Sequence, residues 1–99
     1  MKIKEGTFSS FLTLNNLVLH AHTVGKKWYI DFYQKVQLDD GYTFPLFGLG
    51  DSIKEAIEDL SIKVLGKVIN VSENNSDESK LVVRVIKVPD KWEDEDITF

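Results

Sequence analysis

The chain has 99 residues, of which 42% are hydrophobic and 28% charged, so it is long enough for one domain with a modest core and too apolar for a disordered protein. It has no cysteine, which excludes disulfides, thiolate nucleophiles and cysteine-based zinc sites. The net charge of −4 belongs to the end of the chain, because residues 89–99 carry five acids and one base, whereas residues 1–88 carry 11 of each. No apolar run is long enough to cross a membrane, and we expect a cytoplasmic protein.

The first predicted elements are a short helix and a strand. Apolar residues recur at helical spacing over residues 8–14, Thr7 suits an N-cap, and the pair Asn15-Asn16 ends the helix. Residues 17–24 are apolar and partly β-branched, which predicts a strand. One face of this strand is expected to carry Leu17, Leu19 and Ala21, and the other Val18, His20, His22 and Val24.

The clearest predicted strand covers residues 28–38. Gly25, Lys26 and Lys27 form a short turn before it, so it should pair antiparallel with the preceding strand. Its core face is expected to carry Trp28, Ile30, Phe32, Val36 and Leu38, with Gln34 as a polar exception. Its outer face is expected to carry Tyr29, Asp31, Tyr33, Lys35 and Gln37. Residues 39–41, Asp-Asp-Gly, then predict a hairpin turn.

A returning strand over residues 42–47 and a capped helix are predicted next. Pro45 cannot donate a ladder hydrogen bond, so this strand should lie at an edge, be bulged or end early. Residues 48–50, Gly-Leu-Gly, should turn the chain sharply into the helix, which opens with Ser52 and Glu55 in a capping box. The helix is expected to end at Gly66, and its apolar stripe consists of Ile53, Ala56, Ile57, Leu60, Val64 and Leu65.

The C-terminal part predicts two more strands. Residues 68–71 form a short strand, residues 73–79 a polar loop, and residues 81–88 a nearly continuous apolar strand that should be central in the sheet. The expected fold is a single α+β domain over residues 1–88, with a mostly antiparallel five-stranded sheet and a short N-terminal helix. The order after that helix is three strands, a helix and two strands, and residues 89–99 form an acidic tail.

Few residues suggest catalysis. His20 and His22 share one strand face at a spacing that suits two metal ligands, but a third ligand would have to be a carboxylate from elsewhere. Two histidines alone are a weak signal, so we expect neither a metal nor a cofactor. A turn accounts for Asp39 and Asp40, and no Ser-His-acid arrangement is recognisable. The Gly-rich residues 48–52 lack the lysine and third glycine of phosphate loops, so we expect no enzyme.

Bases and aromatic residues are interleaved along residues 26–35. Flat tyrosine rings on the outer face would allow DNA bases to stack, and neighbouring lysines would attract phosphates. The predicted nucleic-acid-binding residues are Lys26, Lys27, Tyr29, Tyr33, Lys35 and Tyr42. The alternative is that the first helix, or a second copy of the chain in a homo-oligomer, covers this Tyr-rich strand.

The tail is the second segment with a functional pattern. Trp92, Ile97 and Phe99 are large apolar residues without an evident partner, and Asp94, Glu95 and Asp96 stand between them. An acidic run closed by an apolar tip suits insertion into a pocket with a basic rim on another protein. The alternative is a frayed, soluble terminus.

This tail resembles the C-terminal tip of bacterial and phage single-stranded-DNA-binding proteins, where an acidic run ends in Asp-Ile-Pro-Phe and recruits replication and repair partners. The matching residues are Asp94, Glu95, Asp96, Ile97 and Phe99, with Thr98 in place of the proline. The order of elements is also that of the OB fold of those proteins. The resemblance implies a non-enzymatic, single-stranded-DNA-binding protein of a bacterium or phage, with a tail that recruits a basic partner protein.

Residues 17–65 resemble HicB-like antitoxin domains, in which a hairpin leads to a third strand and to a helix that opens with Gly-Asp-Thr/Ser-x-x-Glu-Ala. The matching residues are Gly50, Asp51, Ser52, Glu55 and Ala56. This resemblance implies an inhibitor or antitoxin that acts by protein contact, with the acidic tail mimicking nucleic acid.

Overall fold

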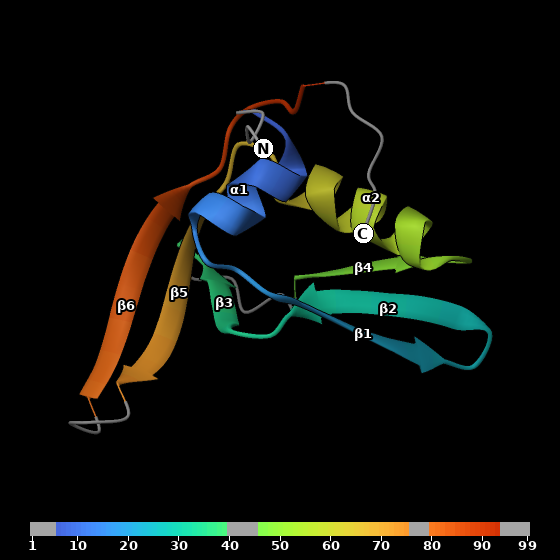
Figure 1. Cartoon of the computed structure of the whole chain (residues 1–99), viewed down its shortest axis with the longest axis horizontal. Coiled ribbons are helices and arrows are strands. Elements are labelled where there is room, and N and C mark those ends of the chain that lie inside the picture. The colour runs from blue at the N-terminus through green and yellow to red at the C-terminus, as the bar shows by residue number, and fades with distance from the viewer. Residues whose placement is uncertain (1–5, 40–45, 76–79, 94–99) are drawn as a thin grey trace.

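The computed structural model describes residues 6–39, 46–75 and 80–93 (Figure 1). The elements in chain order are α1 (Phe8–Leu14), β1 (Leu19–Val24), β2 (Lys27–Phe32), β3 (Lys35–Leu38), β4 (Phe47–Gly50), α2 (Ile53–Lys63), β5 (Val68–Asn75) and β6 (Lys80–Lys87). The predicted turn at Asp40 and Gly41 and the predicted strand residues 42–45 lie outside the described residues.

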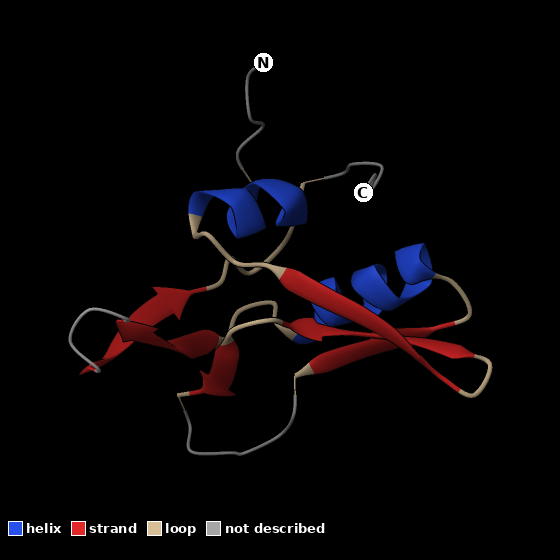
Figure 2. Ribbon diagram, turned by 60° about the horizontal axis from the view of Figure 1, so that its bottom comes forward, coloured by secondary structure: helices blue, strands red, loops and turns tan. Residues whose placement is uncertain are grey.

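The described strands form two three-stranded antiparallel sheets, with the orders β1-β2-β4 and β3-β5-β6. Figures 1 and 2 place α1 above the junction of the two sheets and α2 alongside β4. The α+β class predicted from the sequence is confirmed. The single five-stranded sheet is wrong, because the strands divide between two sheets.

The predicted strand over residues 28–38 is divided between the two sheets. The chain bends at Tyr33 and Gln34, so that β2 belongs to the first sheet and β3 to the second. The Gln34 side-chain amide donates to the Asn16 carbonyl oxygen at 2.6 Å, and its Oε1 accepts from the Val18 amide at 3.0 Å. Gln34, the polar exception on an apolar face, therefore fixes the corner instead of interrupting a core.

Residues 48–50 form the strand β4 and not the predicted turn. The glycines of this strand face α2: a Cβ added at Gly48 would collide with the carbonyl oxygen of Ala56, and one at Gly50 would lie 2.6 Å from the Ala56 nitrogen. A strand can lie this close to a helix only if it lacks side chains at the contact. Gly-Leu-Gly suits either a turn or such a contact, which is why the sequence was misleading here.

The second sheet also differs from the prediction at both ends. β5 continues to Asn75, through residues expected to form a polar loop. β6 is not central but lies at the edge, paired with β5 alone among the described strands. Its outer face is open, and Val83 and Val85 are 51% and 67% exposed. A continuous apolar sequence indicates a central strand only where the sheet has further strands to pair with both edges of that strand.

Both helices begin at the predicted N-caps, Thr7 and Ser52, but the predicted capping box of Ser52 and Glu55 is only half formed. The Thr7 hydroxyl accepts a hydrogen bond from the Ser10 amide at 3.1 Å at the start of α1. At the start of α2 the Ser52 hydroxyl accepts from the Glu55 amide at 3.1 Å. The Glu55 carboxylate accepts in turn from the Asp51 amide at 2.9 Å, one residue before the cap. The two bonds to the hydroxyls satisfy amides that the first helical turn leaves without partners, and the bond to Glu55 fixes the chain just before the second helix.

The core lies between the two helices and the inner faces of the sheets. Its largest fully buried side chains are those of Phe8, Ile30, Leu60, Val64, Ile69, Val71 and Val88. Trp92 packs against this core, because its ring lies 5.3 Å from that of Phe8 and 5.4 Å from that of Phe11, and its indole nitrogen donates to the Ser61 carbonyl oxygen at 2.7 Å. Neither described helix has the length and apolar character needed to cross a membrane.

Candidate functional site

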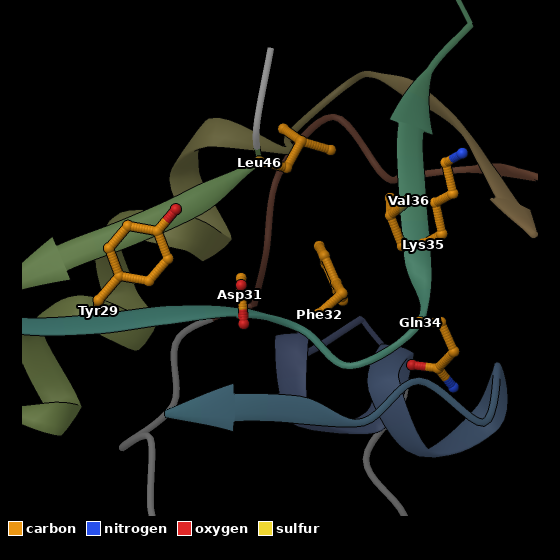
Figure 3. Close-up of a pocket in the computed structure, with 7 residues that line it drawn as sticks. All are labelled: Tyr29, Asp31, Phe32, Gln34, Lys35, Val36 and Leu46. Carbon is orange, nitrogen blue, oxygen red and sulfur yellow. The ribbon is translucent and has the colours of Figure 1, made fainter. Parts of the chain in front are cut away.

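A pocket of about 180 Å³ lies at the corner where β2 bends into β3 (Figure 3). It is lined by Tyr29, Asp31, Phe32, Gln34, Lys35, Val36 and Leu46. The aromatic and aliphatic side chains supply apolar walls, while Asp31, Gln34 and Lys35 supply a carboxylate, an amide and an ammonium group. The pocket therefore offers hydrogen-bond donors and acceptors beside an apolar surface, a combination that suits a flat, polar ligand.

A second, wider hollow of about 830 Å³ borders the same corner. It is lined by Val18, Tyr33, Gln34, Lys35, Ser72 and Glu73. Gln34 and Lys35 line both hollows, so the two meet at the bend. Three of the predicted nucleic-acid-binding residues therefore line hollows at the bend: Tyr29 the first, Tyr33 the second, and Lys35 both.

Tyr29 belongs to a row of rings on the face of β1-β2-β4 opposite α2. Its ring centroid lies 4.5 Å from that of Phe47, nearly parallel at 11°, and 4.5 Å from that of His22. Because β1 and β4 flank β2 on opposite sides, these two rings cover the two faces of the Tyr29 ring. A base can reach the edge and the hydroxyl of Tyr29 more easily than a ring face.

Tyr33 lies apart from this row. It follows the end of β2 and is 76% exposed, so that its ring is open to a ligand in the wider hollow. The prediction that Tyr29 and Tyr33 share the outer face of one continuous strand is wrong, because the bend at Gln34 separates them. Of the two tyrosines, Tyr33 is the better platform for stacking.

The lysines differ in how far they are neutralised. Lys27, at the start of β2, is paired with Asp51: its ammonium donates a hydrogen bond to this carboxylate, and this bond and the carboxylate's charge raise the pKa of Lys27. Within the described ranges, Lys26 and Lys35 make no ion pair. These two cations are therefore available to phosphate groups, and Lys35 is the one that lies at the corner.

Lys63 neutralises the carboxylate of Asp59, which lies beside β4 at the edge of the first sheet. Its ammonium lies 2.8 Å from Asp59 and 4.9 Å above the centroid of the Phe47 ring. Partial burial acts to raise the pKa of Asp59, but the hydrogen bonds from Lys63 and the Leu49 amide hold it below its ordinary value. This carboxylate is thus charged at neutral pH and bound to both a lysine and a backbone amide.

The predicted tail residues divide into two groups. Trp92 packs on α1, and the Glu93 amide donates to the Gly6 carbonyl oxygen at 2.8 Å, so this part of the tail lies on the domain. Trp92 is thus not a free apolar anchor for a partner. The other predicted partner-binding residues, Asp94, Glu95, Asp96, Ile97 and Phe99, and the predicted base-stacking residue Tyr42 lie outside the described residues.

Two residues of the site were not predicted from the sequence. Gln34 lines both hollows, and its place among apolar residues was the one available signal. Phe47 stacks on Tyr29, which only the pairing of β2 with β4 reveals.

Comparison with known proteins gives no further assignment: no family model, no curated protein and no solved structure matches the chain. The proposed function therefore rests on the geometry of the corner and of the sheet faces.

Proposed function

We propose that the protein binds single-stranded DNA across the corner between its two sheets, without catalysing a reaction. The observation that supports this most strongly is the position of Lys35, which lines both hollows, while Tyr29 lines one and Tyr33 the other. A strand crossing the corner would place a phosphate at Lys35 and bases on either side of it. This arrangement is typical of single-strand binding, which combines cations along the backbone with aromatic platforms.

Each hollow would hold its base differently. The corner pocket is large enough for a single base, whose polar edge would meet Asp31 and Gln34. The exposed ring of Tyr33 would stack on the next base in the wider hollow. Lys26, at the turn between β1 and β2, would extend the positive surface, whereas Lys27 would have to exchange Asp51 for a phosphate to do so. Tyr42, also proposed to stack on a base, lies outside the described residues.

The acidic tail would have two roles in a bacterial or phage-infected cytoplasm. The tail residues Asp94, Glu95, Asp96, Ile97 and Phe99 would bind a basic partner protein and, without DNA, compete for the lysines. Removing residues 94–99 leaves Trp92 in place. DNA binding should then become tighter, because a competing negative segment is gone.

Fluorescence anisotropy of a labelled oligo-dT, titrated at two salt concentrations, tests the proposal. Tyr33→Ala should weaken binding by roughly 5- to 150-fold, equivalent to about 1–3 kcal/mol for one stacked base. Lys35→Ala should weaken binding and reduce its salt dependence by about one phosphate contact. Lys54→Ala is the control, because this exposed residue lies on α2, away from both hollows. No binding at low salt would refute the proposal.

A second candidate is an inhibitor or antitoxin that acts by protein contact. It is favoured by the edge strand β6, whose open side and exposed valines suit the addition of a strand from a partner or from a second copy. Light scattering after size-exclusion chromatography tests self-pairing. A dimer that Val85→Lys dissociates would support this candidate, whereas a monomeric protein that binds oligo-dT would favour the first.

A further inference from the structure

A cluster of three metal-ligating side chains lies on the face of β1-β2-β4 that α2 leaves uncovered. His20 and His22 come from β1, and Asp31 from β2, where it is the direct cross-strand partner of His20. One ligand atom from each residue can be chosen so that all three lie within 4.8 Å of one another. The sequence already placed the two histidines on one face; the register of β1 with β2 adds the missing carboxylate.

Two atoms of this cluster are shielded from solvent without a hydrogen-bond partner: Nδ1 of His22 and Oδ1 of Asp31. The Nδ1 of His20 lies 3.3 Å from the same Asp31 oxygen. This is a close approach of opposite partial charges, but it lacks the alignment of a hydrogen bond, and the carboxylate oxygen remains unsatisfied. Shielded polar atoms without partners are costly unless something binds them.

We propose that His20, His22 and Asp31 bind one divalent transition-metal ion of the Zn²⁺ type, with a fourth position left for water or an external ligand. Two imidazoles and a carboxylate form a donor set that suits Zn²⁺ and its neighbours, whereas Mg²⁺ and Ca²⁺ prefer oxygen ligands alone. The site shares Asp31 with the pocket proposed for a base, but it needs neither Tyr33 nor Lys35, so titration of the metal alone tests it separately from DNA binding.

The observed spacing can close to that of a bound ion. Ligands about 2.0–2.1 Å from a tetrahedral Zn²⁺ stand about 3.4 Å apart. The pairs within 4.8 Å must therefore approach by up to about 1.4 Å, which side-chain rotation can supply on a surface where His20 is 58% exposed. The backbone need not move, because the β1-β2 ladder already holds both strands in register.

Tyr29 acts as a positioning residue for this site. It is the cross-strand partner of His22, and its ring lies 4.5 Å from the imidazole. Phe47 supports it from the opposite side at 4.5 Å. The imidazole of His22 is therefore held in one orientation before an ion binds, which lowers the entropy that binding must remove.

Isothermal titration of the untagged, chelator-treated full chain with Zn²⁺ tests the site. We expect one ion per chain, and Co²⁺ in its place should give the visible absorption of a four-coordinate ion. His20→Gln, His22→Gln and Asp31→Asn should each weaken binding by at least about tenfold, since loss of mere outer-shell partners costs about 10- to 100-fold. Asp51→Asn is the matched control, because this carboxylate lies near the same sheet but pairs with Lys27.

Three results would overturn the proposal: no saturable binding by the wild type, equal binding by the ligand variants and the control, or one ion per two chains. Far-UV circular dichroism shows whether each variant is folded. Amide chemical shifts of the wild type give a test that needs no variant, because Zn²⁺ should shift residues 19–23 and 30–32. Shifts confined to other parts of the chain would also contradict the site.

Discussion

The sheet β1-β2-β4 and the sheet β3-β5-β6 differ in what covers them. On the first, α2 lies against glycines on one face, and rings and metal-ligating groups occupy the other. The second buries Ile69 and Val71 of β5 in the core and leaves the valines of β6 open at its edge. The helix-backed sheet is thus suited to hold side chains in fixed positions, and the open sheet to accept another strand.

The contact of α2 with the first sheet provides the largest expected effect. Gly48→Ala should destabilise the domain by about 4 kcal/mol, because the new methyl group would meet the backbone of Ala56 and not a side chain that can move. Urea unfolding measures this loss. Leu49→Ala is the control; its side chain points away from α2 and is 42% exposed, and it should cost less than about 1 kcal/mol. Equal losses would mean that α2 does not determine the stability of this sheet.

Replacing Trp92 tests how strongly its contacts hold α1 on the domain. Trp92→Ala should cost about 2–3 kcal/mol, since it removes an indole from Phe8 and Phe11 and a hydrogen bond to Ser61. Trp92→Phe keeps the ring contacts and should cost about 1 kcal/mol. Thermal unfolding followed by circular dichroism distinguishes them. If Trp92→Ala and a chain lacking residues 94–99 had the same stability, the indole would not stabilise the domain. Trp92 would then have to be counted with the acidic tail.

Gln34 joins the two regions, and its removal should have an intermediate effect. Gln34→Ala leaves the Asn16 carbonyl and the Val18 amide without their side-chain partner and should cost about 1–2 kcal/mol. Gln37→Ala is a matched control, because it lies on β3 with an exposed side chain. Urea unfolding of the two variants gives the comparison. Identical midpoints would show that the corner does not depend on this amide.

The smallest effect concerns pH. A carboxylate with a lowered pKa stabilises the folded state above the pKa of the unfolded chain, and this contribution is lost as pH falls through the folded pKa. For Asp59 the loss should therefore occur in the acid range, below the ordinary pKa of an aspartate. Because the side chain is 37% exposed, we expect less than about 0.5 kcal/mol. Unfolding measured against pH should be less steep for Asp59→Asn; an unchanged slope would exclude this contribution.

Local features of the fold could be predicted, and long-range ones could not. Thr7 and Ser52 mark the starts of their helices because each bonds to an amide only three residues away. The alternation of side chains around His20 likewise predicts the two faces of β1. The bend at Gln34 depends on partners 16 and 18 residues away. The role of Gly48 depends on where α2 lies, and the meeting of Asp31 with the histidines depends on strand register.

The order of the strands along the chain has a consequence for how the domain unfolds. β3 of the second sheet lies in sequence between β2 and β4 of the first, so neither sheet is a continuous segment. No single cut of the backbone can therefore release one sheet intact. The two sheets should therefore unfold together in one cooperative transition, and a protease that opens either one should destroy both.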